Sequence, residues 1–399
     1  MGNYTALEDP LIDQTIENHM RCIVESIVAR MPPQTIALRG SFGRGEGSVM
    51  PRGDSLYFLS DYEIDVATPS PFYRSVFSAL SKEMTEQLGV QTGIRWMRPD
   101  CLVKDRIGPF PIKREAITIS LYEFRYGSRV LFGDDFISNG PVIDPRHIRL
   151  ESGFQLLLNR MAESLSYMSL EDDYQDKSLV TYHWINKTIL ACAEALLLLW
   201  ESYHFSYRER GVRFAELAQT RLGFMQSQAA LFAELIKRAT EWKLLPAAHL
   251  YMDTVRNSWE QIIPICGAVF KHLSEQGLSI PFDDYPEFAQ LYLQKTAGSA
   301  GFRSTVLRLP KKMLEAYRAI GAHGSMRNLS SRYFASQIVY SAVPLLFLCY
   351  GAEPQVEYLH EARAQLAKLG ELDQPREDVS EEWDYLRKKL FVFWKMYCY

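Results

Sequence analysis

The sequence predicts an α+β protein with a mixed-sheet domain over residues 1–145 and an all-helical bundle domain over residues 146–399. Three observations support this prediction. Short apolar runs separated by turn residues stop near residue 140. Longer segments with apolar residues every three to four positions follow from about residue 150. A chain of 399 residues also exceeds the usual single core, so we expect two domains joined within residues 142–149.

The N-terminal part is expected to begin with an amphipathic helix over residues 11–30. Its apolar side chains recur at helical spacing, and Pro32 and Pro33 follow its end. Short runs of β-branched and aromatic residues then predict strands, with one helical period between them. The expected strands are 35–38, 57–67, 92–97, 116–120 and 129–132, and the expected helix is 72–88. Strands that enclose a helix in this order favour a compact domain with a mixed sheet.

The C-terminal part shows only helical periodicity, which predicts a bundle. The expected helices are 150–168, 178–205, 225–242, 246–275, 329–349, 355–369 and 380–396.

Composition narrows the class of protein. The net charge is -4, whereas proteins that bind long nucleic acids usually carry an excess of basic residues. A long nucleic acid is therefore not expected as a partner. The six cysteines show no CxxC spacing, which argues against a zinc site or a disulfide framework. The N-terminal segment has no basic region followed by an apolar one, and the longest apolar run, 189–200, is too short to span a bilayer. We therefore expect a cytoplasmic protein without a membrane segment.

A glycine-rich turn follows the first expected strand. Gly40 and Ser41 come directly after this strand, at a point where a short helix can begin. Backbone N–H groups and a serine hydroxyl in such a turn can bind a phosphate, and glycine allows the close approach. The alternative is a simple strand exit, since glycine-rich turns are common.

An acidic strand lies further along the chain. Asp61, Glu63 and Asp65 alternate with apolar residues, so a strand places all three carboxylates on one face. Carboxylates in a row repel one another, and hard divalent cations such as Mg²⁺ would relieve this repulsion. The alternative is the solvated face of an edge strand.

The two features together resemble the signature of the DNA polymerase β-like nucleotidyltransferase superfamily. That signature is an apolar residue, Gly-Ser, a spacer, and Asp-apolar-Glu-apolar, and Leu38 to Ser41 and Asp61 to Ile64 are similar to it in order and type. The resemblance implies that Gly40 and Ser41 bind the phosphates of a nucleoside triphosphate. It also implies that Asp61 and Glu63 bind two Mg²⁺ ions during nucleotidyl transfer with pyrophosphate release.

The chain departs from this signature in two ways. The spacer is longer than usual, so residues 47–58 are expected to form an inserted loop. The third acidic residue is not evident, because Thr118 and Ser120 stand where an aspartate is expected. Asp65 is the favoured replacement, as metal ligand or base. Glu115 and Glu123 are the other candidates for this third position. A degenerate, non-catalytic site is the remaining alternative.

Cationic side chains are expected to assist the phosphates. The resemblance implies a lysine on the helices that follow the catalytic domain, for which Lys187 is the candidate, although a surface lysine would fit the pattern equally well. Arg44 is a second candidate, close to the glycine turn. Residues 202–210 mix aromatic and cationic side chains that can stack a base or pack a helix end.

The expected function is therefore Mg²⁺-dependent transfer of a nucleoside monophosphate from a nucleoside triphosphate, with ATP the expected donor. The acceptor would be a hydroxyl of a small molecule, a nucleotide or a protein. An oligonucleotide or cyclic-dinucleotide synthase of the antiviral-signalling type is the first alternative. A nucleotide-binding regulatory protein with a decayed site is the second.

Overall fold

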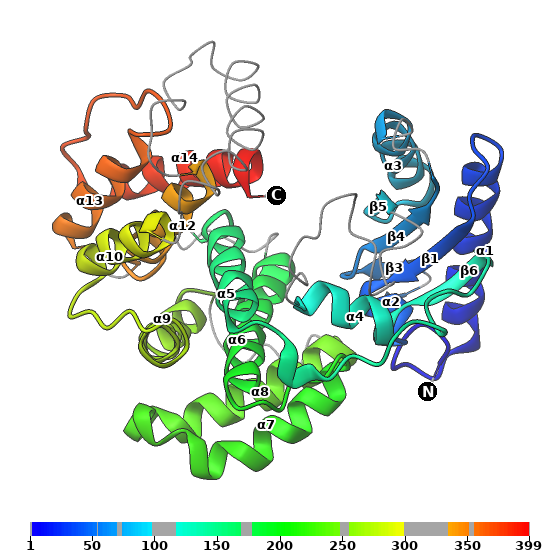
Figure 1. Cartoon of the computed structure of the whole chain (residues 1–399), viewed down its shortest axis with the longest axis horizontal. Helices are drawn as coiled ribbons and strands as arrows, with labels where there is room; N and C mark the ends of the chain where they lie inside the picture. The colour runs from blue at the N-terminus through cyan, green and yellow to red at the C-terminus, as the bar shows by residue number, and fades with distance from the viewer. Residues whose placement is uncertain are drawn as a thin grey trace. The chain divides into compact units, whose positions relative to one another are not determined.

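The chain forms two compact units in the computed structural model (Figure 1). The structure describes residues 2–53, 55–69, 74–97, 117–168, 178–247, 255–298, 334–350 and 355–398. Unit 1 consists of Met1–Gly153, Leu196–Leu222 and Ala229–Met252. Unit 2 consists of Phe154–Ala195, Gly223–Gln228 and Asp253–Tyr399. The expected boundary at 145/146 lies close to the first junction, but unit 1 also contains two later helical stretches.

Unit 1 contains a small mixed sheet, which confirms the predicted α+β class. Its strand order is β5-β4-β1-β6, and β1 pairs antiparallel with both β4 and β6, while β4 and β5 run parallel. The strands are β1 (Thr35–Arg39), β4 (Tyr62–Ala67), β5 (Thr92–Met97) and β6 (Arg129–Gly133).

One face of the sheet carries the core of this unit. Helices α1 (Pro10–Val28) and α3 (Arg74–Leu88) contribute apolar side chains to one buried cluster with alternate residues of the strands (Figure 1). The strand residues in this cluster are Ile36, Leu38, Tyr62, Ile64, Val66 and Ile94. Because successive strand side chains point to opposite faces, the residues between them face away from this core. The charged residues of β4 therefore lie on the other face.

Helix α4 (Ile119–Gly127) packs beside β1 through a second buried cluster, in which Phe124 lies near Ala37. The predicted strand at 116–120 is wrong, as far as these residues are described. Thr118 caps the helix by accepting a hydrogen bond from the N–H of Leu121 at 3.2 Å. The alternation of Ile and Ser resembles a strand, but the threonine cap starts a helix at Ile119.

The segment predicted as one strand at 57–67 forms two. A separate hairpin of β2 (Val49–Arg52) and β3 (Ser55–Phe58) precedes β4 and occupies most of the expected inserted loop. The backbone N–H of Ser48 donates to Ser60 Oγ at 2.9 Å, and the N–H of Leu59 donates to the Ser48 carbonyl at 3.0 Å. These contacts interrupt the strand at residues 59–61.

Two helices of the later sequence complete unit 1, namely α7 (Tyr207–Arg221) and α8 (Ala229–Leu244). Helix α7 was not predicted, although Ser206 and Glu209 have the spacing of a capping box and Ser206 Oγ does accept from the Glu209 N–H at 3.3 Å. Helix α6 (Ser178–Leu199) ends earlier than the expected 205, and Glu201 after it adopts a φ of 57°.

Unit 2 is helical, and its helices pack around aromatic side chains such as Phe154, Phe270 and Phe288. Its helices are most of α5 (Leu150–Leu165), most of α6, α9 (Val255–His272), α10 (Tyr285–Gly298), α12 (Ala335–Phe347), α13 (Val356–Leu366) and α14 (Val379–Tyr397). The short helical turns η3 (Gly223–Gln228) and η5 (Leu273–Gly277) also belong to unit 2, whereas η2 (Pro145–His147) belongs to unit 1.

Helices α5, α8, α9, α12, α13 and α14 lie where the sequence predicted helices, whereas α10 was not predicted. Residues 248–254 and 329–333 of two predicted helices lie outside the described residues. Within the described ranges, no helix combines the length and the apolar character needed to cross a bilayer.

The end of β6 gives a stability prediction. Gly133 has a φ of +82°, and a Cβ atom there would lie 1.9 Å from the carbonyl oxygen of Gln34. We expect Gly133→Ala to lower the free energy of unfolding by about 2–4 kcal/mol through backbone strain and overpacking. Gly89→Ala is the matched control, because Gly89 has a φ of +66° and nothing within 4 Å of its Cβ position. Urea unfolding followed by circular dichroism should show the larger loss for position 133, and equal losses would contradict the clash.

Candidate active site

The glycine turn brings the end of β1 against the acidic strand. Gly40 opens the short helix α2 (Gly40–Gly43) with a φ of +67°, in the left-handed region that favours glycine. A Cβ atom at Gly40 would lie 3.1 Å from Cδ of Glu63 and 3.2 Å from its Oε2. The next residue, Ser41, is half-buried, and its hydroxyl forms no hydrogen bond within the described part of the chain. Two of the predicted residues, Gly40 and Glu63, therefore lie in direct proximity.

The three predicted carboxylates occupy different environments. Asp61 is exposed just before β4, and it has no ion pair among the described residues. Glu63 is partly exposed, with 32% of its side-chain surface accessible, and Asp65 retains only 7%. The strand register places Arg39 of β1 opposite Glu63 and Ala37 opposite Asp65. Glu63 and Asp65 thus share the sheet face away from the α1 and α3 core.

Two arginines neutralise Glu63 and Asp65. Arg39 Nε lies 3.1 Å from Glu63 Oε2, and its Nη1 lies 3.2 Å from Asp65 Oδ2. From β5, Arg95 Nη2 approaches Glu63 Oε2 to 3.1 Å, while its Nε lies 3.6 Å from Asp65 Oδ1. Burial opposes the charge of Arg39, but Asp65 and Glu63 outweigh it and raise the pKa of this guanidinium. Neither arginine is predicted from the sequence, although strand alternation alone places Arg39 and Glu63 on corresponding faces.

A three-carboxylate cation site is not present in the described residues, since no three His, Cys, Asp or Glu side chains there are arranged to hold a metal ion. Alternate residues on a strand are about 7 Å apart, too far for three short side chains to converge unaided. Asp65, the expected third ligand, has both oxygens directed to arginines. Its role as ligand or base stays a prediction. Asp61 and Glu63 fit a magnesium ion better, because Mg²⁺ commonly uses one or two carboxylates and completes its shell with phosphates and water.

The other candidates for the third position have different partners. Thr118 caps α4, and Ser120 Oγ accepts a hydrogen bond from Arg39 Nη2 at 2.9 Å. Glu123 accepts from Arg210 Nη1 at 2.8 Å and belongs to the network described next. Glu115 lies outside the described residues.

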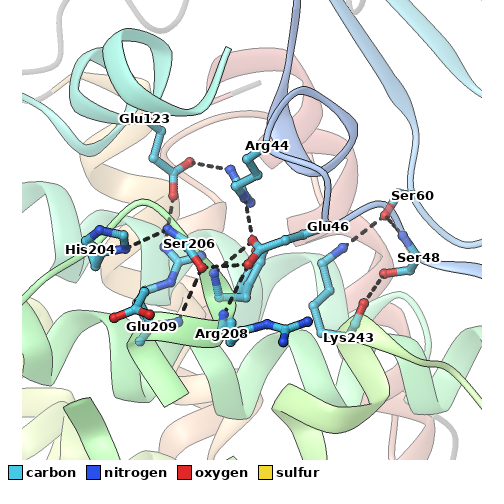
Figure 2. A network of polar contacts seen from close by, with 12 residues as sticks. Arg44, Glu46, Ser48, Ser60, Glu123, His204, Ser206, Arg208, Glu209 and Lys243 are labelled. Atoms are coloured by element: carbon cyan, nitrogen blue, oxygen red, sulfur yellow. Dashed lines mark hydrogen bonds and ion pairs between the residues drawn. The ribbon is translucent and has the colours of Figure 1, made fainter. Parts of the chain in front are cut away.

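A buried ionic network lies beside the glycine turn (Figure 2). Arg44, a predicted phosphate ligand, has only 4% of its side chain exposed, and its guanidinium lies between two carboxylates. Its Nε lies 3.1 Å from Glu46 Oε2, and its Nη1 lies 3.6 Å from Glu123 Oε2. Tyr203 and Arg210 also donate to Glu123, both at 2.8 Å. This arrangement favours a structural role for Arg44, and its contact with a nucleotide stays a prediction.

Glu46 joins this network to the start of α7. Its carboxylate accepts hydrogen bonds from Ser206 Oγ at 2.6 Å and from the backbone N–H groups of Tyr207 and Arg208 at 2.9 and 3.2 Å (Figure 2). Burial opposes ionisation, but Arg44 and these donors outweigh it and lower the pKa of Glu46. Figure 2 shows the same side chains linking the turn after β1 with α4 and α7. Residues 202–210, expected to stack a base or pack a helix end, thus supply structural contacts.

Lys243 at the end of α8 is a cation that the sequence analysis did not single out. Its Nζ donates to Ser60 Oγ at 3.0 Å, and its carbonyl accepts from Ser48 Oγ at 2.6 Å (Figure 2). Ser60 directly precedes Asp61, so this buried group fixes the chain next to a predicted site residue. The sequence Glu-Trp-Lys-Leu-Leu around Lys243 carries no signal for that role.

Lys187, the other predicted cation, belongs to unit 2. It lies on α6, with Nζ 4.2 Å from the centroid of the Trp184 ring, a cation–π arrangement. Its expected contact with nucleotide phosphates stays a prediction.

The ionic network predicts a large loss of stability for Glu123→Gln. This change removes the carboxylate charge that both Arg44 and Arg210 contact, and breaking a buried ion pair typically costs about 3–5 kcal/mol of unfolding free energy. Glu83→Gln is the control, because its pair with Arg30 is exposed and should contribute less than about 1 kcal/mol. Chemical unfolding at pH 7 measures both, and similar small losses would show that the network contributes little.

The same carboxylates predict a dependence on pH. Arg44 and hydrogen-bond donors outweigh burial and hold the pKa values of Glu46 and Glu123 below the ordinary value. The unfolded chain therefore binds their protons first, and the stability they contribute is present above about pH 4.5 and lost as pH falls through the folded-state pKa values. Unfolding measured from pH 6 to pH 3 should show a steeper loss for the wild type than for Glu123→Gln. Parallel curves would contradict this assignment.

Comparisons of this chain with family models, with curated proteins and with solved structures gave no match.

Proposed function

We propose that the protein is a Mg²⁺-dependent nucleotidyltransferase of the DNA polymerase β-like type, which moves a nucleoside monophosphate from a nucleoside triphosphate to a hydroxyl. The observation that supports this most is the approach of the Gly40 backbone to the Glu63 carboxylate. The two segments of the signature are separated in sequence, and the pairing of β1 with β4 brings them together. Turn and carboxylate meet where the two central strands end and begin, as phosphate and metal binding would require.

The residues present fit a magnesium ion at Asp61 and Glu63. Asp61 is exposed, and Glu63 is partly exposed, with its Oε2 3.2 Å from the Cβ position of Gly40. When bound, the ion would neutralise phosphate charge and polarise the reacting oxygens. The glycine turn would bind the triphosphate rather than the ion. The backbone of Gly40 and the hydroxyl of Ser41 would hold the triphosphate in place, and Lys243 would keep the segment around Asp61 fixed through Ser60.

The proposed reaction follows from this placement. An acceptor hydroxyl attacks the α-phosphorus, a new P–O bond forms, and the bond to the bridging oxygen of the β-phosphate breaks. Pyrophosphate leaves with the electron pair, and the proton of the hydroxyl passes to water. The protein contributes mainly by holding the reactants and by countering charge, as is typical of phosphoryl chemistry. ATP is the expected donor, and the acceptor is a small molecule, a nucleotide or a protein hydroxyl.

A second candidate function is nucleotide binding without transfer. The neutralisation of Glu63 and Asp65 by Arg39 and Arg95 favours it, because an ion pair can replace the cation that catalysis needs. An oligonucleotide or cyclic-dinucleotide synthase remains a special case of the main proposal, in which the acceptor is a second nucleotide.

Substitution of the proposed metal ligands tests the main proposal. We expect Asp61→Asn and Glu63→Gln each to reduce Mg²⁺-dependent pyrophosphate release by at least about 100-fold, which corresponds to about 2.7 kcal/mol of lost charge stabilisation. The measurement is pyrophosphate release from nucleoside triphosphates in the presence of cell lysate, with mass spectrometry to find molecules that have gained a nucleoside monophosphate. Glu83→Gln should leave both readouts unchanged.

Two results would overturn the enzymatic proposal. One is the absence of pyrophosphate release and of modified molecules with the wild-type chain. The other is activity that survives both substitutions. If the wild-type chain binds nucleotide in equilibrium dialysis but releases no pyrophosphate, the binding function stands instead.

A further inference from the structure

Glu63 and Asp65 lie between two arginines that differ in how firmly they are held. Arg39 has 17% of its side chain exposed, and Ser120 provides a third contact beyond the two carboxylates. Arg95 has 52% exposed and lies on β5, at the end of the strand order. Its contacts within the described ranges are the two carboxylates. Arg39 is therefore the fixed partner, and Arg95 is the one that can leave.

The Glu63 oxygen nearest the Gly40 turn is already occupied. Glu63 Oε2 receives both Arg39 Nε and Arg95 Nη2 at 3.1 Å, and this oxygen also lies closest to the Gly40 turn. A divalent cation and a guanidinium compete for the same lone pairs, and they repel each other at this distance. Cation binding at Glu63 Oε2, the oxygen nearest the Gly40 turn, therefore requires at least one arginine to move.

Moving Arg95 has a small cost. Ion pairs with more than half of one partner exposed change an equilibrium constant by only a few fold, since water and salt replace the lost contact. No backbone change is needed, because the long side chain can turn into solvent from the edge strand. Moving Arg39 would also break its hydrogen bond with Ser120 and leave a mostly buried guanidinium without a countercharge.

We propose that Arg95 is a displaceable countercharge that neutralises Glu63 and Asp65 in the free protein, leaves when a divalent cation binds, and thereby sets the cation affinity of the site. This proposal rests on the proposed function only for the location of the cation. The role of Arg95 adds a regulatory property to the site. The carboxylates are neutralised when no cation is bound, and the fraction of molecules in which a cation replaces Arg95 rises with cation concentration.

The test measures Mn²⁺ binding to the full chain without nucleotide, by electron paramagnetic resonance of the free ion. Arg95→Gln should bind Mn²⁺ roughly two- to fivefold more tightly than the wild type, the range expected for loss of one exposed ionic competitor. Arg95→Lys retains the charge and should stay within about twofold of the wild type. Arg30→Gln is the matched control, because Arg30 forms a similarly exposed pair with Glu83 away from the site, and its affinity should be unchanged.

A second variant locates the effect. Adding Glu63→Gln to Arg95→Gln should abolish the gain in affinity, because the two side chains act on one ion and their effects are coupled.

Arg95→Glu places a third carboxylate beside Glu63 and Asp65. It should therefore show a rise in unfolding temperature on addition of Mg²⁺ that exceeds the rise in the wild type. This readout needs no activity.

The outcomes separate this inference from the proposed function. Unchanged or weaker Mn²⁺ binding in Arg95→Gln, or no Mn²⁺ binding in any variant, overturns the role of Arg95. A gain in affinity that depends on Glu63, combined with no nucleotidyl transfer by the wild type, supports the role of Arg95 and overturns the enzymatic proposal. A gain of equal size in Arg30→Gln would show a general charge effect and also overturn the role of Arg95.

Discussion

The antiparallel pairing of β1 with β4 brings the glycine turn and the acidic strand of unit 1 together. It places Arg39 opposite Glu63 and Ala37 opposite Asp65, and it brings Gly40 beside the Glu63 carboxylate. Side chains alternate along a strand, so a shift by one residue would turn the carboxylates toward α1 and α3 and expose Ile64 in their place. The burial of the apolar residues of β4 therefore maintains the acidic face.

Two charge clusters flank the turn at Gly40 and Ser41, and each contains two arginines and two carboxylates. Arg44, Arg210, Glu46 and Glu123 form the more deeply buried cluster, in which only Glu123 keeps a notable exposed fraction, 21% of its side chain. A buried charge without its partner is costly, so this cluster holds the turn, α4 and α7 in one arrangement. The cluster of Arg39, Arg95, Glu63 and Asp65 is open on the side of Arg95. Ligand binding at the turn would require this arrangement, in which the buried cluster holds the backbone fixed and the exposed pairs of Arg95 can rearrange.

The helices α7 and α8 of unit 1 contact residues on both sides of the proposed site. Glu46 accepts hydrogen bonds from the first residues of α7, and Lys243 at the end of α8 contacts Ser60 next to Asp61. The segment after the glycine turn and the segment before Asp61 are therefore both held by helices that are far away in sequence. The proposed site therefore depends on α7 and α8 as well as on the sheet.

The sequence by itself determined the α+β class, the glycine turn, the first helix and most strands, because these follow from local periodicity and from turn residues. It also predicted that Gly40 and Glu63 belong to one site, from two short segments of the sequence, and the structure brings these two residues close together. Only the tertiary structure decided that Thr118 begins a helix, that Arg39 and Arg95 neutralise the acidic strand, and that Arg44 and Glu123 form a buried network. These ion pairs join residues that are distant in sequence. Strand register and the burial of charged side chains decide which residues pair, and a local sequence pattern contains no information on either.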